Sequence, residues 1–213
     1  PTAYPPAEPA EAVTPTDPAA YPDPAGENIA SGDLVRFDLV PDESEARYLI
    51  TEQLAGRDLP NDVIGTTKQV AGVIYLTSDG GLDANQSKFV IQAGTLATDQ
   101  DRRDGYVRQN TLQTSTYPEI IFVPTAVSGL DNPLTVSGEV SFVLTGQLTI
   151  RDVTKEESWE VTGTVDGDTA KGTAKTALKF ADFNLSKPSV PVVLSVEDNI
   201  RLEIELTLRR AAN

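Results

Sequence analysis

The alternation of apolar and polar residues near the C-terminus is the feature that most restricts the fold of this chain. From residue 200 to residue 209, every second residue is apolar, and those between are polar or charged. A strand places successive side chains on opposite faces, so one face of this segment should meet an apolar interior and the other water. The predicted inner face comprises Ile200, Leu202, Ile204, Leu206 and Leu208.

The same period of two recurs from Leu34 onward, with turn residues between the runs. Asp79-Gly80-Gly81 and Asp166-Gly167-Asp168 are hairpin signals, because glycine supplies the positive φ that such turns require. Eight or nine long strands with no convincing helix predict an all-β barrel or sandwich. Strands are expected near residues 34–39, 45–54, 66–77, 86–96, 118–126, 137–151, 154–166, 169–180 and 197–210.

Two segments depart from this pattern. Residues 1–32 are rich in proline, alanine and acidic residues, which predicts an extended linker, a stalk or a plain disordered terminus ahead of a barrel domain over residues 33–213. Residues 100–116 are long for a structureless loop, so we expect a short helix or a lid there. The alternating charges of residues 101–108 favour a structural ion-pair cluster over a catalytic or anion-binding site.

The composition excludes several classes of function. The chain has no cysteine, histidine or methionine, which removes thiol and imidazole nucleophiles, Ser-His-Asp triads and most zinc, copper or haem ligation. Asp79, Asp83 and Asn85 have calcium-like spacing, but a plain hairpin turn is favoured. A net charge of -15 makes nucleic acid and anionic membrane surfaces poor partners.

The sequence has no apolar run of 18 residues, so no transmembrane segment is expected. It begins with Pro1 rather than methionine, from which we expect a processed form that has lost any signal peptide.

Three separated motifs resemble the YceI family. They are the Asp101–Arg108 segment followed by Tyr117-Pro118 and Phe122, the segment Gly146–Lys155, and Phe180-Ala181-Asp182-Phe183. The resemblance covers roughly residues 33–210. It departs at Tyr106, where the family usually has histidine, which puts a headgroup contact there in doubt. It also departs at Asp152, where the family usually has glycine and where we expect aspartate to accept an unusual φ.

The resemblance implies an extended antiparallel, eight-stranded, lipocalin-like barrel that is periplasmic or secreted, is often a homodimer, and binds a polyisoprenoid or quinone-like lipid without catalysis. Such a barrel can enclose one small ligand. No cofactor or metal is expected apart from the lipid. The side chains expected to contact it are Phe89, Ile91, Tyr106, Phe122, Phe142, Leu144, Leu148, Trp159, Val161, Phe180, Phe183, Leu202, Ile204 and Leu206.

Two other functions remain open on sequence grounds. The same apolar residues could pack against one another in a filled barrel, which would leave a structural or adhesion module that binds another protein through its acidic surface or stalk. A hydrolase using paired carboxylates such as Asp101 and Asp104, or Glu156 and Glu157, is the weakest interpretation, because no nucleophile has an evident base. Trp159 favours a cavity, since a lone buried indole requires a hydrogen-bond partner or open space beside it.

Overall fold

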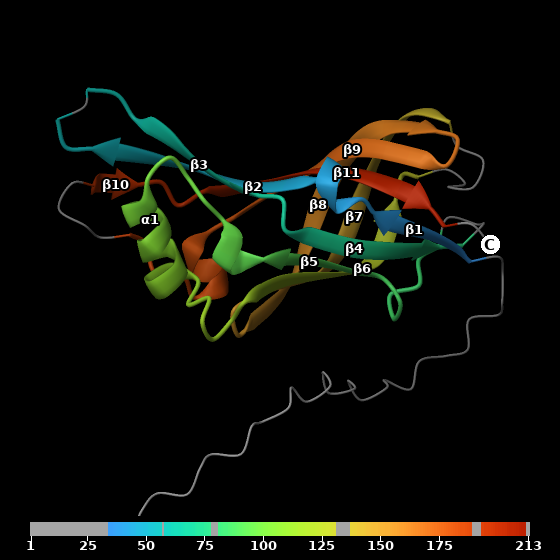
Figure 1. Cartoon of the computed structure of the whole chain (residues 1–213), viewed down its shortest axis with the longest axis horizontal. Coiled ribbons are helices and arrows are strands. Elements are labelled where there is room, and N and C mark those ends of the chain that lie inside the picture. The colour runs from blue at the N-terminus through green and yellow to red at the C-terminus, as the bar shows by residue number, and fades with distance from the viewer. Residues whose placement is uncertain (1–33, 57, 78–80, 131–136, 189–192, 212–213) are drawn as a thin grey trace, which may run out of the picture. The chain divides into compact units, whose positions relative to one another are not determined.

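Strands dominate the computed structural model, which describes residues 34–56, 58–77, 81–130, 137–188 and 193–211 (Figure 1). The predicted linker over residues 1–32 lies outside this part of the chain. The strands are β1 (Val35–Leu39), β2 (Glu45–Leu54), β3 (Asn61–Thr67), β4 (Val70–Leu76), β5 (Lys88–Gln92), β6 (Glu119–Ser128), β7 (Gly138–Ile150), β8 (Val153–Asp166), β9 (Thr169–Leu178), β10 (Val193–Val196) and β11 (Ile200–Arg210).

Eight of these strands form a closed antiparallel barrel. Their order around the ring is β1-β4-β5-β6-β7-β8-β9-β11, and β1 closes the ring by pairing with β11, with Leu39 opposite Leu208. Closure leaves the ring strands hydrogen-bonded on both sides, which removes the open edges of a flat sheet. The predicted all-β, eight-stranded antiparallel barrel is therefore confirmed.

The remaining strands extend the barrel on one side. Strand β2 continues from β1 after the single 3₁₀ turn η1 (Pro41–Glu43) and pairs with β11, β3 and β10. Strands β3, β2 and β10 thus form a three-stranded extension beyond the ring (Figure 1).

The predicted strand over residues 66–77 is two strands, and this expectation was wrong. The break falls at Lys68 and Gln69, where the Gln69 backbone N–H donates to the Thr67 hydroxyl at 3.0 Å instead of continuing a ladder. Strand β10 was not predicted either, since it is only four residues long.

The hairpin turns follow the sequence signals in part. Gly167, between β8 and β9, has a φ of 56°, as the predicted turn requires. Between β7 and β8, however, the residue with positive φ is Arg151, at 58°, rather than Asp152. The Asp79-Gly80-Gly81 signal begins in residues 78–80, outside the described part of the chain.

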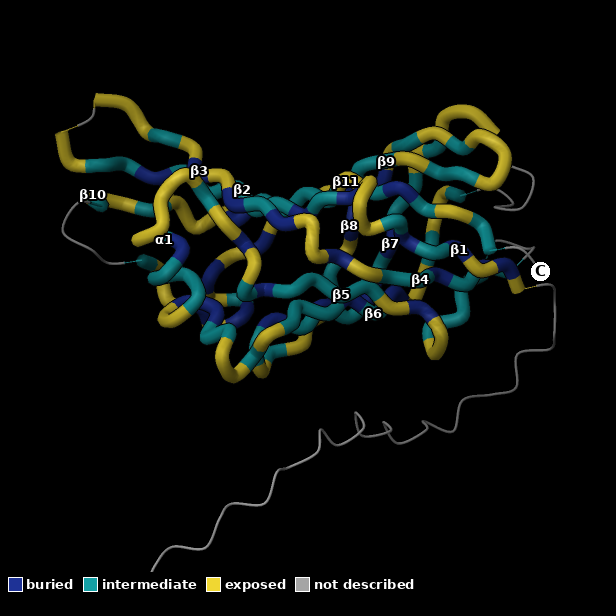
Figure 2. The backbone as a smooth tube through the Cα atoms, in the orientation of Figure 1, coloured by how far each residue is buried: buried dark blue, intermediate teal, exposed yellow. Residues whose placement is uncertain are grey.

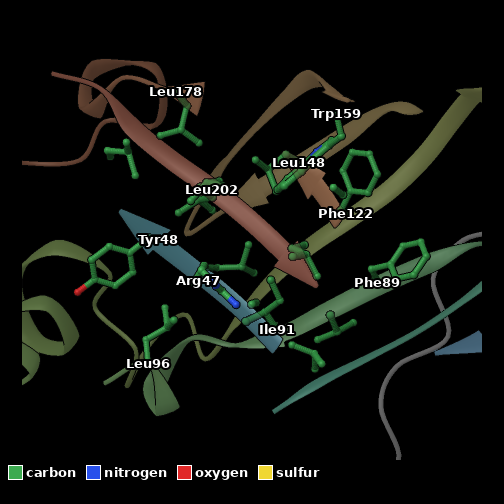
Figure 3. Close-up of a pocket in the computed structure, with 18 of the residues that line it drawn as sticks. Arg47, Tyr48, Phe89, Ile91, Leu96, Phe122, Leu148, Trp159, Leu178 and Leu202 are labelled. Carbon is green, nitrogen blue, oxygen red and sulfur yellow. The ribbon is translucent and has the colours of Figure 1, made fainter. Parts of the chain in front are cut away.

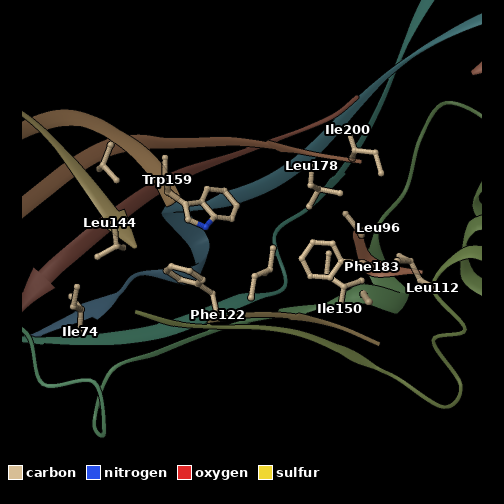
Figure 4. Packing of buried hydrophobic residues seen from close by; sticks show 14 of the residues in the cluster. Ile74, Leu96, Leu112, Phe122, Leu144, Ile150, Trp159, Leu178, Phe183 and Ile200 are labelled. Atoms are coloured by element: carbon tan, nitrogen blue, oxygen red, sulfur yellow. The ribbon is translucent and has the colours of Figure 1, made fainter. Parts of the chain in front are cut away.

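Side chains that point into the ring form the apolar core. Buried residues alternate along the second half of β7, as a half-buried strand requires (Figure 2). The main cluster draws on every ring strand and on the 3₁₀ helix η4 (Phe180–Phe183), whose Phe183 is fully buried (Figure 4). The core therefore follows the inner wall of the barrel.

The segment between β5 and β6 is helical, which confirms the short helix predicted near residues 100–116. It follows the 3₁₀ turn η2 (Ala93–Thr95) and contains α1 (Asp101–Tyr106) with one π-helical turn, η3 (Val107–Thr111). No helix of the described residues is long and apolar enough to cross a membrane.

Candidate functional site

A cavity of about 180 Å³ lies inside the barrel. All eight ring strands contribute to its wall, and so do β2 and the helical segment after β5 (Figure 3). An engineered apolar cavity of about 150 Å³ stays dry and binds benzene, so this space can hold an apolar group. The barrel is therefore not filled completely by its own side chains.

Twelve of the fourteen predicted contact residues line this cavity. Each lies on the inward face of its strand, apart from one that lies in η4. They are Phe89, Ile91, Phe122, Phe142, Leu144, Leu148, Trp159, Val161, Phe180, Leu202, Ile204 and Leu206.

The structure places the other two elsewhere. Phe183 is fully buried within the core cluster and has no face on the cavity. Tyr106 ends α1, and the residues that the helical segment presents to the cavity are Val107, Thr111 and Leu112. Tyr106 is not one of the residues that line the cavity.

Sequence reasoning missed several wall residues. Tyr48 and Ile50 on β2 line the cavity, but Leu49 between them masks the alternation that would reveal an inner face. Leu112 follows the helical segment, so its direction depends on how that segment packs against the barrel. Alternation locates wall residues within strands but not in the connections.

Tyr48 on β2 is one of the polar side chains that line the cavity. Its register partner on β3 is Gly65, and a Cβ atom there would meet the Tyr48 hydroxyl oxygen at 2.7 Å, so the absence of a side chain makes room for the ring. Burial raises the pKa of Tyr48 to about 12, and the negative charges of Asp104 and Glu52 add to the rise, while Arg103 opposes it. The phenol is therefore neutral at physiological pH.

The ion pairs differ from those expected within residues 101–108. Among the described residues, Arg103 is the member of that segment that forms ion pairs, and both of its partners lie outside the segment. Arg103 contacts Glu52 on β2 at 2.9 Å and Asp99 at 2.6 Å. Asp104 is buried and accepts hydrogen bonds from the backbone N–H and the hydroxyl of Thr98, at 2.9 and 2.7 Å. These contacts hold the helical segment against the barrel extension, and the sequence did not identify Glu52 as a partner.

Polar atoms beside the cavity are few. Arg47 is the charged residue of the wall, and its guanidinium pairs with Glu205 and, at 3.3 Å, with Glu45. Within the described residues, the Trp159 indole nitrogen and the Thr111 hydroxyl oxygen are buried without a hydrogen-bond partner. The open space beside Trp159 agrees with the expectation for a lone buried indole.

Of the residues with calcium-like spacing, Asp83 has a structural role. One Asp83 carboxylate oxygen accepts from the backbone N–H groups of Asn85 and Gln86, at 2.9 and 3.3 Å. The carboxylate thus holds a turn, and Asp79 lies outside the described residues.

Residues 37–208 match the model of the YceI-like domain. The chain belongs to the YceI-like domain family. This match confirms the resemblance carried by the three sequence motifs. No curated protein matches this YceI-like chain.

Solved structures share the fold of this YceI-like chain at low sequence identity. BcnA of Burkholderia cenocepacia is 17% identical, with a TM-score of 0.60, covering 80% of this chain and 99% of that one. A polyisoprenoid binding domain from Saccharophagus degradans, implicated in plant cell wall breakdown, is 12% identical, with a TM-score of 0.61, covering 82% and 98%. The YceI protein of Campylobacter jejuni is 20% identical, with a TM-score of 0.57, covering 76% and 91%.

Proposed function

We propose that this YceI-like chain binds, stores or carries a long apolar lipid of the polyisoprenoid or isoprenoid-quinone class inside its barrel, without catalysing a reaction. The observation that carries the proposal is the apolar cavity of about 180 Å³ to which every ring strand contributes. The Saccharophagus degradans domain, which has the same fold, is described as polyisoprenoid binding. The twelve predicted wall residues would contact the tail.

The energetics of burial support an apolar tail as the main source of affinity. Each buried CH₂ group contributes about 0.8 kcal/mol, whereas association costs an estimated 4 to 15 kcal/mol. A tail of several isoprene units offsets that cost without a strong headgroup contact. We also propose that the protein acts in the periplasm or outside the cell, as the YceI resemblance implies.

The alternative is a structural or adhesion module with a filled barrel. The cavity of about 180 Å³ counts against complete filling. Binding of another protein through the acidic surface would not depend on this space.

Uptake of an isoprenoid quinone tests the proposal. Purified protein is incubated with the quinone and examined by native mass spectrometry, and we expect one quinone per chain. Ala174→Leu adds apolar atoms to the cavity wall, so it should reduce uptake at least about tenfold if the tail loses the space of two or more CH₂ groups.

Lys175→Leu is the matched control. Lys175 is the exposed neighbour of Ala174 on β9, so this substitution introduces the same leucine side chain on the outside of the barrel. It should leave uptake unchanged. Absence of any bound quinone in the wild-type chain would rule out the proposed ligand class, and equal uptake by the two variants would place the ligand outside the cavity.

A further inference from the structure

A second, smaller cavity of about 80 Å³ lies in the same barrel. Some of its wall residues, such as Leu76, Val140 and Val165, do not touch the larger cavity. Five apolar residues line both cavities, and we call this set the waist. It consists of Ile74, Phe142, Val161, Leu206 and Leu208.

The waist residues lie on four ring strands, β4, β7, β8 and β11, of which β7 and β8 are neighbours. Along β7, Leu144 lines only the larger cavity, Phe142 lines both, and Val140 lines only the smaller one. Along β8, the corresponding residues are Trp159, Val161 and Gly163. The change therefore occurs at the same height on two adjacent strands.

The strand register of β7 and β8 agrees with this common height. Phe142 and Val161 are direct cross-strand partners, as are Leu144 and Trp159 one step further along. Across the barrel, Ile74 on β4 makes the same change, since Val70 lines the larger cavity and Leu76 the smaller one. In Figure 4, Ile74 lies at the opposite end of the core from Leu112 beside the helical segment.

We propose that the waist sets the length of apolar tail that the barrel accepts, and that Phe142 is the side chain that closes it. This inference rests on the proposed function. Phe142 is the only aromatic residue of the five and is half-buried, so its ring occupies the most space between the two cavities. A tail seated in the larger cavity stops at the ring.

A length limit of this kind has a measurable signature. While added carbons enter the larger cavity, each should raise affinity by up to about fourfold, which corresponds to 0.8 kcal/mol per CH₂. Carbons that cannot pass the waist remain in water and add nothing. Affinity plotted against tail length should therefore rise and then reach a plateau.

The test measures affinity for a series of isoprenoid alcohols that differ by one isoprene unit. In Phe142→Ala, the two cavities join, so the plateau should begin at least one isoprene unit later than in the wild type, with at least about tenfold higher affinity for the longest tails. Phe142→Leu removes less volume and carries the test if the alanine variant does not fold. Thermal unfolding checks the fold of each variant.

Phe89→Ala is the matched control, because it makes the same change in a residue that lines only the larger cavity. A photoreactive diazirine at the tail end distinguishes depth from width. The wild type and Phe89→Ala should carry the cross-link on wall residues of the larger cavity, and Phe142→Ala on Val140 or Leu76.

Two results are separable. If no isoprenoid alcohol binds the wild-type chain, the proposed function itself fails. If tails bind but the plateau and the cross-link site are the same in Phe142→Ala as in the wild type, the waist does not set tail length and the inference is overturned.

Discussion

The rings of Phe122 on β6 and Trp159 on β8 meet edge to face beside the cavity, with centroids 5.8 Å apart and planes inclined by 63°. Such aromatic pairs contribute about 0.5 to 1.5 kcal/mol beyond their burial. Strand β7 lies between them in the sheet, with Leu148 opposite Phe122 and Leu144 opposite Trp159. The pair therefore joins, through side chains, two strands of the cavity wall that are not hydrogen-bonded to each other.

Trp159 is the single tryptophan of the chain, so it should report tail binding by its fluorescence. Its indole is buried beside the cavity, and an apolar tail carrying bromine atoms should quench its emission in a saturable way. An unbrominated tail of equal length should compete. Quenching that does not saturate would indicate surface adsorption rather than entry into the barrel.

Cavity-wall and core residues should differ in their effect on stability. Phe183→Ala removes a fully buried side chain, so the free energy of unfolding should fall by about 3 to 5 kcal/mol. Leu202→Ala changes a partly buried wall residue and should cost less than about 2 kcal/mol while weakening tail binding. Chemical denaturation measures both values. A loss at Leu202 as large as that at Phe183 would indicate a packed interior there.

The ion pair between Arg103 and Glu52 should matter more than a surface pair. Glu52 is 8% exposed and Arg103 is 17% exposed. Glu52→Gln removes one of the two carboxylates that pair with Arg103 while Asp99 remains, so the free energy of unfolding should fall by about 1.5 to 3 kcal/mol, the usual contribution of a hydrogen bond to a charged group. In the control, Asp38→Asn breaks an exposed pair with Arg36 and should cost less than about 1 kcal/mol. Equal costs in denaturant titrations would show that the helical segment does not depend on this contact.

Tyr48 should make stability depend on alkaline pH. Burial raises its pKa from 10.0 to about 12 in the folded chain, so the unfolded chain releases this proton first. The contribution of Tyr48 to stability is present below pH 10 and is lost as the pH rises towards 12. Unfolding measurements across this range should show a smaller decline in Tyr48→Phe than in the wild type. Parallel curves would contradict the assignment.

The barrel was predictable because strand alternation is a local property. The run from Ile200 to Leu208 specifies one inner face, and hydrogen bonding then places it beside other strands with the same period. The break at Lys68 and Gln69 was not predictable, since Val70 and Ile74 continue the apolar pattern beyond it. The break separates β3, which pairs within the extension, from β4, which pairs within the ring, and this division depends on tertiary structure.

The candidate site likewise contains residues that local alternation predicts and residues that only the tertiary structure brings together. Inward residues such as Leu144, Phe142 and Leu202 follow from alternation alone. Glu52 and Arg103 are 51 positions apart in the sequence. They are not paired through the sheet register, so strand pairing alone does not predict their contact. The pair forms because α1 packs against the barrel extension, which no local sequence pattern encodes.

Closure of the ring through β1 and β11 allows the backbone to hold the barrel wall together while the side chains of the lumen remain free to vary. Main-chain hydrogen bonds hold the wall together, so the side chains of the lumen do not all need to pack closely against one another. Single substitutions can therefore reshape the lumen during evolution while the architecture persists, and relatives with little sequence in common can retain one scaffold for cargoes of different dimensions.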